Sequence, residues 1–382
     1  MKMLNKILLL SIMAFGMVSM STSCNKDDDA SNGGVPRIKY VRVTNPTSSD
    51  SLLVGAGQGM LIAIVGENLQ NAVEIWFNDQ RATLTPTYIT NTTILVSVPS
   101  KIPTVITNKI KIIFSNGKEL LYDFEVQISK PLVGSMVCEH VNAGQVATIR
   151  GNYFYAPISV TFTGGATAEI VSVKDQTLEI RIPANAQPGQ ITVKTNFGET
   201  KSDFWFRDNR NMFIDSDPYE GWWNSNYVVT NPGPADPPKI SGNYLRFQKS
   251  IAAWSWNELA GGPASAMPVH SHRIPDEAIL KPEDYYLKFE VNTIKPYNSN
   301  LMKINVALSA EDNNAYKWSP PFDTKGAWQT VVIPFETVVA SYAVRPAVNP
   351  NGYWSRLLFH GEGALDADIC FDNFRVVPKV LH

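Results

Sequence analysis

The sequence predicts an all-β protein with two small β-sandwiches in tandem, followed by a larger, jelly-roll-like β-sandwich. After Pro36, the chain of 382 residues consists of short β-forming runs separated by Gly, Pro and Asn, with scarcely any stretch of helical period. Two consecutive stretches of about 80 to 95 residues repeat the same motifs, which indicates duplication of one folding unit. The last stretch has no repeat partner and no helical patterns between its strands, which favours a larger sandwich over a parallel α/β sheet.

The duplication is visible as blocks that recur in the same order. The matched blocks are residues 61–66 with 146–151, 75–77 with 160–162, 93–99 with 177–183, 115–117 with 195–196, and 123–124 with 203–204. In the first copy, an alternating strand at residues 110–114 leads into a turn at Asn116-Gly117. The length of each copy, the number of strands and the spacing of turns fit an immunoglobulin-like sandwich.

Both copies also share a local pattern. A strand ending in Gly is followed by a bulky residue, Leu69 or Phe154, and a later strand closes at Val-Pro or Ile-Pro. This pattern resembles the IPT/TIG family of immunoglobulin-like domains. The resemblance implies two such domains, residues 36–129 and 130–206, which in that family are commonly spacers or binding modules. Because these repeats have no aromatic cluster of their own, we expect them to act as a spacer.

Residues 207–382 are expected to form the third domain. Within it, residues 326–335 join a turn to an alternating strand, and they resemble a strand of many carbohydrate-binding jelly rolls. Trp328 in this strand is expected in the core. The ending at residues 371–376 also resembles those modules, and a bulge near Asp372-Asn373 would bring the apolar residues on both sides of it into one core. Those apolar residues are Ile369, Phe371, Phe374 and Val376.

The N-terminus predicts secretion. Lys2 and Lys6 precede an apolar run at residues 7–18, which is followed by small residues and Cys24. A charged segment, a short apolar segment and a small-residue cleavage site are typical of a secretory signal peptide, here residues 1–23, and the apolar run is too short to span a membrane.

The residues around Cys24 predict lipidation. Residues 21–24 (Ser-Thr-Ser-Cys) resemble a bacterial lipobox, in which the Cys becomes the lipidated first residue of the mature protein. Residues 24–35 would then be a flexible, lipidated tether. The acidic run at residues 25–29 resembles the export signal of Bacteroidetes-type surface lipoproteins. This resemblance implies a lipid anchor in the outer membrane, with the protein facing the exterior.

Composition excludes several classes of function. A formal net charge of −2 and a pI near 6.2 offer no basic surface for nucleic acid. Cys138 and Cys370 lie in different expected domains, so we expect no disulfide between them, and two cysteines make no metal site. His270 and His272 lie in a Pro-rich loop without a nearby third ligand, which indicates surface residues. We therefore expect neither a metal nor a cofactor.

Aromatic residues carry the functional prediction, because seven of the nine tryptophans lie after position 205. Several aromatics sit in loop-like composition, namely Trp222, Trp223, Trp254, Trp256, Trp318, Tyr353 and Trp354. Loops seldom supply enclosing apolar surface, so we expect these side chains to be exposed, although a place in the core stays open for two or three of these tryptophans. Trp254 and Trp256, at positions i and i+2, would lie roughly 6.6 Å apart on one side of an extended segment.

Exposed indoles suit sugar binding. A pyranose in a β-linked chain has an apolar C–H face that a flat aromatic ring covers, while nearby amides and carboxylates take its hydroxyls. Asn257 and Glu258 flank the indoles and are the expected polar partners.

The order of parts resembles the surface glycan-binding proteins of Bacteroidetes polysaccharide-utilisation systems. This resemblance rests on the lipobox Cys24 with its acidic tail, the tandem IPT/TIG-like domains and the Trp-rich last domain. The resemblance is to the type that binds xyloglucan or a related β-glucan such as mixed-linkage glucan. It implies a non-catalytic protein that captures the polysaccharide beside a TonB-dependent transporter. In that type, one Trp early in the last domain and an aromatic cluster some thirty residues later form the platform, as Trp222 or Trp223 and the Trp254/Trp256 pair would here.

Two other classes of function stay as alternatives. The immunoglobulin-like repeats are also compatible with a protein-binding adhesin. A glycoside hydrolase needs two carboxylates at a set separation, and no spacing singles out a pair among Glu258, Asp276, Glu277 and Glu283. A structural Ca²⁺ at Asp366 and Asp368 is a further alternative.

Overall fold

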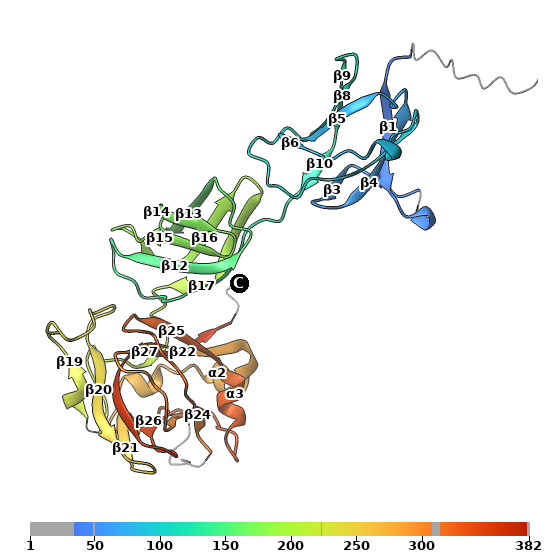
Figure 1. Cartoon of the computed structure of the whole chain (residues 1–382). Coiled ribbons are helices and arrows are strands. Elements are labelled where there is room, and N and C mark those ends of the chain that lie inside the picture. The colour runs from blue at the N-terminus through green and yellow to red at the C-terminus, as the bar shows by residue number, and fades with distance from the viewer. Residues whose placement is uncertain (1–33, 49, 223, 308–313, 380–382) are drawn as a thin grey trace, which may run out of the picture. The chain divides into compact units, whose positions relative to one another are not determined.

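A computed structural model describes residues 34–48, 50–222, 224–307 and 314–379 (Figure 1). The expected signal peptide, the lipidation site Cys24, most of the tether and Trp223 lie outside the described residues. Within the described part, no helix combines the length and the apolar character needed to cross a membrane. The chain divides into two compact units, residues 1–128 and 129–382.

The first unit is a β-sandwich around one hydrophobic core. One sheet has the order β2 (Leu52–Leu53), β1 (Arg37–Val43), β4 (Leu61–Glu67) and β7 (Thr93–Ser97), and another has the order β6 (Gln80–Arg81), β5 (Ala72–Phe77), β8 (Lys109–Phe114) and β9 (Glu119–Asp123). In addition, β3 (Gly55–Gly57) pairs in parallel with β10 (Glu125–Gln127). Two 3₁₀ turns, η1 (Pro46–Ser48) and η2 (Pro86–Tyr88), complete the unit. Ile62 and Ile64 on β4 and Ile110 and Ile112 on β8 are all fully buried in the same core. Their i, i+2 spacing follows from the two-residue period of a strand.

The second unit begins with a similar sandwich that has its own core. Its sheets are β11 (Leu132–Met136), β12 (Val146–Asn152), β15 (Thr177–Arg181) and β14 (Glu169–Lys174), and β13 (Ile158–Thr163), β16 (Gln187–Thr195) and β17 (Gly198–Phe206).

The pairing registers reproduce the sequence repeat. In the first unit Leu61 on β4 pairs with Ser97 on β7, and in the second unit Val146 on β12 pairs with Arg181 on β15. These are equivalent positions of the repeated blocks. The structure therefore confirms that the two copies form the same strand pairs.

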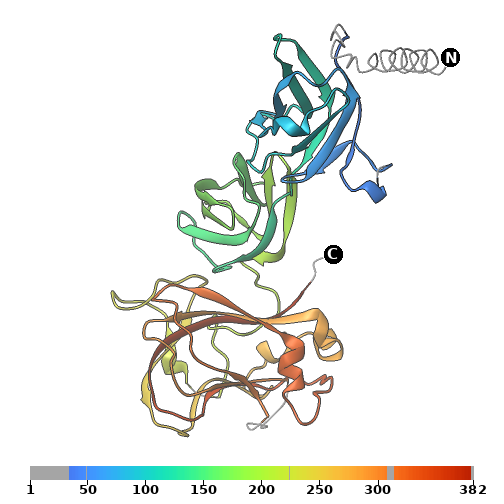
Figure 2. The ribbon, with the colours of Figure 1, turned by 45° about the vertical axis from the view of Figure 1, so that its right-hand side comes forward.

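The rest of the second unit is a larger sandwich (Figure 2). The six-stranded sheet contains β19 (Val228–Val229), β20 (Tyr244–Ile251), β27 (Leu365–Pro378), β22 (Tyr285–Thr293), β25 (Gln329–Pro334) and β18 (Met212–Ile214); the four-stranded sheet has the order β21 (Asn257–Gly262), β26 (Ser355–Phe359), β23 (Met302–Val306) and β24 (Tyr316–Trp318). Short helices α2 (Asp276–Leu280) and α3 (Phe335–Ala340) lie at one side, and η3 (Ser225–Tyr227), η4 (His270–His272) and η5 (Pro282–Asp284) are 3₁₀ turns. The all-β prediction holds for the sheets. The two short helices were not predicted, because neither is long enough for two full helical turns.

The last strand contains the expected bulge. Lys288 on β22 pairs with Arg375 on β27, and Glu290 on β22 pairs with Asp372 on β27. Between these two pairs, β22 advances by two residues and β27 by three. β27 therefore has one extra residue at this point, which changes the side of the sheet that its side chains face. The four apolar residues on both sides of the bulge, Ile369, Phe371, Phe374 and Val376, are fully buried in one core, as predicted.

A small separate cluster contains Trp328, which is buried as expected but outside the main core of the C-terminal sandwich. It packs with Cys138, Cys370, Ile240 and Tyr244. Both cysteines are buried and free. The cysteines come from parts of the chain that the sequence placed in different domains, and the fold brings them into one apolar cluster.

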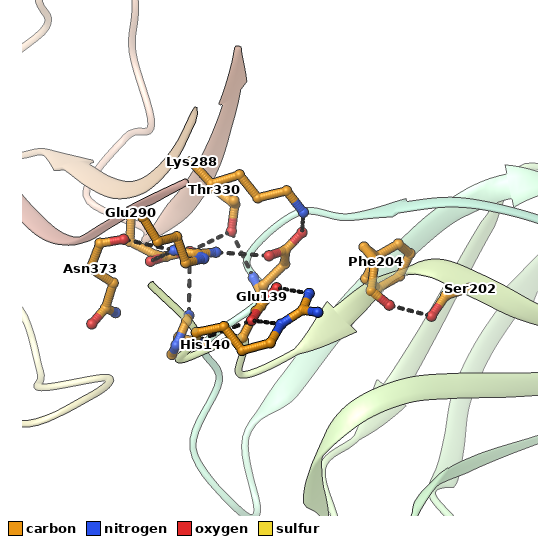
Figure 3. A network of polar contacts seen from close by, with 11 residues as sticks. Glu139, His140, Ser202, Phe204, Lys288, Glu290, Thr330 and Asn373 are labelled. Carbon is orange, nitrogen blue, oxygen red and sulfur yellow. Dashed lines mark hydrogen bonds and ion pairs between the residues drawn. The ribbon is translucent and has the colours of Figure 1, made fainter. Parts of the chain in front are cut away.

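A network of buried charges joins the second small sandwich to the C-terminal sandwich (Figure 3). The guanidinium of Arg375 is fully buried and donates to Glu290 Oε2 at 2.8 Å and to Glu139 Oε2 at 2.7 Å. The ammonium of Lys288 donates to the other oxygen of Glu139 at 2.6 Å. Glu139 follows β11, whereas the other three residues belong to β22 and β27. The network therefore ties the two sandwiches of the second unit together.

Arg375 and Glu290 keep each other ionised. Burial lowers the pKa of Arg375, but the carboxylates of Glu290 and Glu139 outweigh burial and keep that pKa above its ordinary value. Burial raises the pKa of Glu290, but Arg375 and His140, whose Nδ1 lies 3.3 Å from Glu290 Oε1, lower it by more. The hydroxyl of Thr330 donates to Glu290 Oε1 at 2.9 Å and accepts the backbone N–H of Glu139 at 2.8 Å.

Replacing Arg375 by Met is expected to lower the free energy of unfolding of the second unit by about 3–5 kcal/mol, because Glu139 and Glu290 stay buried without their shared cation. Urea unfolding of the full chain at pH 7 measures this loss. Arg181→Met is the matched control, because it removes the same side chain from an exposed pair with Glu169 and should cost about 1 kcal/mol or less. Equal losses in the two variants would contradict the prediction.

Asp372 provides a test by pH. Burial, together with the charge of Glu290, raises the pKa of Asp372 well above its ordinary value. An unfolded Asp ionises near pH 3.9, so the wild type loses stability as the pH rises from there towards the raised folded-state pKa. Asp372→Asn lacks this loss. Urea unfolding at several pH values should therefore show the variant gaining relative to the wild type above about pH 4; a difference independent of pH would refute this account.

Candidate functional site

Among the described tryptophans of the C-terminal sandwich, three are exposed. Trp222 is 46%, Trp254 is 59% and Trp256 is 50% accessible. All three lie next to β21, which pairs antiparallel with β26 in the four-stranded sheet. Exposure of three indoles in one region is unusual for a folded domain and marks a candidate binding surface.

Trp254 sits in a tight turn. Its φ is +58°, the backbone N–H of Ser255 donates to Ala252 O, and the N–H of Trp254 donates to Gly361 O at 2.8 Å. The segment containing Trp254 and Trp256 is therefore not extended, contrary to the expectation from their i, i+2 spacing. Both indoles nevertheless meet the same ring, because His360 lies 5.8 Å from Trp254 and 5.3 Å from Trp256 between ring centroids.

Trp222 lies beside the edge of β21 that does not pair with β26. Gly221 forms a parallel bridge with Gly261, and the backbone N–H of Trp222 donates to Gly261 O at 3.2 Å. Gly261 has φ +105°, and a Cβ there would lie 2.2 Å from Ser355 O, so only glycine allows this approach of the backbones. The ring of Trp222 meets that of Trp354 edge to face at 5.8 Å.

Arg356 connects the two groups of rings. Its guanidinium carbon lies 5.0 Å from the ring centroid of Trp256 and 4.9 Å from that of Trp354, which is within range for cation–π attraction. The result is a continuous series of planar groups along the edge of β21 and β26, which we call the aromatic row: Trp254, His360, Trp256, Arg356, Trp354 and Trp222.

Arg356 also makes the polar contact of the site. Its guanidinium forms an ion pair with Glu258 at 3.3 Å, and both side chains are largely covered. Burial lowers the pKa of Arg356, and the carboxylate of Glu258 partly offsets this effect. Arg356 pairs across the sheet with Gly261, which has no side chain to occupy the space above it. On β26, the neighbour Leu357 points into the core, so Arg356 points to the outer face of the sheet.

Three predicted site residues lie elsewhere. Trp318 is 7% accessible and packs in the core against Tyr297 and Phe289, because β24 pairs with β23 and directs Trp318 inwards. Tyr353 is buried, and its hydroxyl donates to Asp276 Oδ1. The prolines after Trp318 and the Gly before Tyr353 resembled loop composition, but both residues pack against neighbours that are distant in the sequence. We therefore leave both out of the candidate site.

Asn257 is also buried, and its amide donates to Ser255 Oγ at 2.8 Å, so it supports the turn rather than facing solvent. Sequence reasoning missed Arg356 and His360. The strand expected at residues 356–359 could have indicated Arg356, because alternation in a strand directs Arg356 and Leu357 to opposite faces of the sheet. Nothing in the sequence indicated that His360 would lie between two indoles.

The acidic residues near the site have cationic or hydroxyl partners. Glu258 pairs with Arg356, Asp366 with Lys295, and Asp368 with Arg246. Among the residues that the structure describes, no group of three or more His, Cys, Asp or Glu side chains is arranged to hold a metal ion. The aromatic row thus offers flat apolar faces with a guanidinium and a carboxylate beside them, which suits binding of a ligand that has apolar faces and polar edges.

Comparison with known proteins concerns this same region. Residues 206–378 match the family model described as surface glycan-binding protein B xyloglucan binding domain, and the whole aromatic row lies within them. The family is one of binding domains, which confirms the expectation that the chain is not an enzyme.

Individual proteins agree with this match. An IPT/TIG domain-containing protein of Bacteroides ovatus is 27% identical over 156 residues, 39% of this chain, and the match spans only 31% of that relative's length. The crystal structure of surface glycan-binding protein PbSGBP-B from Prevotella bryantii is similar with a TM-score of 0.64 at 25% identity, over 91% of this chain and 99% of that chain. SGBP-B from a complex xyloglucan utilization locus in Bacteroides uniformis has a TM-score of 0.48 at 17% identity, over 90% of this chain and 100% of that chain, a likeness too distant for a functional argument.

The resemblance to surface glycan-binding proteins with IPT/TIG domains is confirmed by these comparisons. The lipid anchor, the sugar that is bound and the role of each tryptophan stay predictions.

Exposed and buried tryptophans should differ in their contribution to stability. Trp254→Ala and Trp256→Ala are each expected to change the free energy of unfolding by about 1 kcal/mol or less, because the indoles are half exposed. Trp318→Ala should cost about 3–5 kcal/mol, because it leaves a cavity in the core. Thermal and urea unfolding of the full chain measure these differences. A large loss in Trp254→Ala or Trp256→Ala would place these rings in the core and contradict a surface role.

Proposed function

We propose that this chain, whose residues 206–378 belong to the surface glycan-binding protein B xyloglucan-binding domain family, captures a β-glucan at the cell surface and catalyses nothing. The observation that carries the proposal is the aromatic row, in which three half-exposed indoles are linked through Trp354, His360 and the largely covered Arg356. Xyloglucan and mixed-linkage β-glucan are the two ligands that we propose, and the name of the matching family supports xyloglucan.

Binding would work by stacking. Each glucose ring in a β-linked backbone has C–H faces that lie flat on an indole, and an aromatic contact contributes about 0.5–1.5 kcal/mol beyond the apolar area that it buries. Micromolar affinity corresponds to about 8 kcal/mol, so several rings must act on one extended chain. A row of rings meets this requirement better than a single pocket, because each ring meets a different sugar of the polymer.

Polar groups beside the row would orient the sugar. Arg356 has a planar guanidinium with several donors, and Glu258 next to it accepts hydrogen bonds. We propose that these two side chains and His360 contact hydroxyl groups at the edges of the stacked sugars. Trp223, which lies outside the described residues, remains a proposed neighbour of Trp222.

The position of the row in the fold supports capture at a distance from the membrane. Lys288 and Glu290 point outward from the six-stranded sheet and contact Glu139 and His140 of the preceding sandwich, respectively. The row lies on the outer side of the four-stranded sheet. The two outer faces of the C-terminal sandwich thus have different roles, one for attachment and one for the ligand. We further propose that residues 36–129 and 130–206 act as a spacer and that lipidated Cys24 anchors the chain in the outer membrane, beside a TonB-dependent transporter that takes up the glycan.

Affinity electrophoresis of the full chain tests the proposal in gels that contain xyloglucan, barley mixed-linkage β-glucan or galactomannan. We expect retardation in at least one β-glucan gel and none in galactomannan. Trp256→Ala should weaken binding at least about tenfold, because a large ring at the centre of the row is lost. Trp76→Ala, in the first unit, is the control and should bind as the wild type does.

Two outcomes would overturn the proposal. Unretarded migration of the wild type in both β-glucan gels would leave protein adhesion as the better explanation of the surface. Release of oligosaccharides from either polymer during incubation would show catalysis.

A further inference from the structure

His270 is a buried residue with two acidic neighbours. The side chain is 1% accessible, so the expectation that it lies at the surface is wrong. Its Nε2 lies 3.2 Å from Asp215 Oδ1, and its Nδ1 lies 3.4 Å from Glu220 Oε2. Neither contact has the alignment of a regular hydrogen bond, so both are close contacts of ion-pair type. The pattern could not be read from sequence because Asp215 and Glu220 precede His270 by about fifty residues.

His270 lies in a cluster of charged side chains, with Asp215 beside one ring nitrogen and Glu220 beside the other. Arg273 is the other charged group of this cluster, and it donates to Asp215 Oδ2 at 3.0 Å. Burial raises the pKa of Asp215, but its contacts with His270, the backbone N–H of Asp217 and Arg273 lower it by more. The cluster therefore holds the chain near Asp215 and Glu220 against η4.

Glu220 is the link to the aromatic row, because it lies two residues before Trp222. Its carboxylate accepts the backbone N–H of Val269 at 3.1 Å and that of His270 at 2.8 Å, in addition to its contact with the imidazole. Two backbone donors and the adjacent imidazole, all from one turn, thus fix the side chain of Glu220. The backbone then continues through Gly221 to Trp222, whose N–H donates to Gly261 O and secures the far end of this short segment.

The same turn holds the partner of Trp222. The carbonyl of Ser271, next to His270, accepts the backbone N–H of Tyr353 at 2.8 Å. Tyr353 immediately precedes Trp354, the ring that meets Trp222 edge to face. η4 therefore contacts both chain segments that supply the tryptophans at this end of the row.

We propose that His270 is a positioning residue, which, through Glu220, fixes the Trp222–Trp354 end of the aromatic row for glycan binding. The inference rests on the proposed function, because it assigns to His270 a role in the same site. His270 does not touch the ligand. Its contribution is to hold Trp222 at one angle to Trp354, so that binding loses less conformational entropy.

The test is a double-mutant cycle on the full chain with His270→Gln and Trp222→Ala, with binding to xyloglucan and barley β-glucan measured by isothermal titration calorimetry. Each single variant should weaken binding about three- to tenfold, the range expected for one aromatic contact. The double variant should bind no more weakly than Trp222→Ala alone, because His270 acts only through Trp222. His272→Gln, two residues away on the same turn, is the matched control and should bind as the wild type does.

The outcomes separate this inference from the proposed function. Absence of binding by the wild type contradicts the proposed function itself. Wild-type binding that is unchanged in His270→Gln overturns the positioning role alone. Multiplied losses in the double variant would also overturn it, since they would mean that His270 acts independently of Trp222. Thermal unfolding of His270→Gln identifies general destabilisation, which would weaken binding equally with Trp222 present or absent.

Discussion

Neutralisation of a buried guanidinium organises the second compact unit. Arg375 is inaccessible to water, and a charge in that position is stable only with carboxylates at hydrogen-bond distance. One of them, Glu290, lies on the neighbouring strand of the same sheet. The other, Glu139, precedes Arg375 by 236 residues and belongs to the preceding sandwich. The contact of the two sandwiches is therefore required by the charge and cannot slide without leaving an ion unpaired.

The opposite face of the C-terminal sandwich carries the aromatic row. The six-stranded sheet turns Lys288 and Glu290 towards the preceding sandwich, and both sheets bury their apolar sides in the common core. The aromatic row lies on the outer side of the four-stranded sheet, along β21 and β26. Arg356 on this face is buried like Arg375, but its neighbours are the rings of Trp256 and Trp354 and the carboxylate of Glu258. The same residue type thus contacts carboxylates of two sandwiches on one face and indoles on the other.

Much of the fold follows from patterns that are local in sequence. The repeated blocks form equivalent strand pairs because hydrophobic alternation specifies which residues face a core, and both copies have the same alternation. The bulge near Asp372 was predictable because two pairs of apolar residues on β27 differ in parity. The concentration of tryptophans after position 205 correctly indicated the region of the candidate site, since exposed Trp222, Trp254 and Trp256 all lie there.

The sequence by itself determined the repeated strand blocks, the core faces and the part of the chain in which aromatic residues gather, because these depend on residue types and spacing. Only the tertiary structure decided which aromatics are exposed and how they are held. Trp318 is buried because β23 lies beside it, and Trp254 is exposed because its turn is fixed by Gly361. His270 is buried rather than exposed because the chain segments of Asp215 and Glu220 fold against it. Burial and ion pairing are properties of neighbours in space, and those neighbours are distant along the chain.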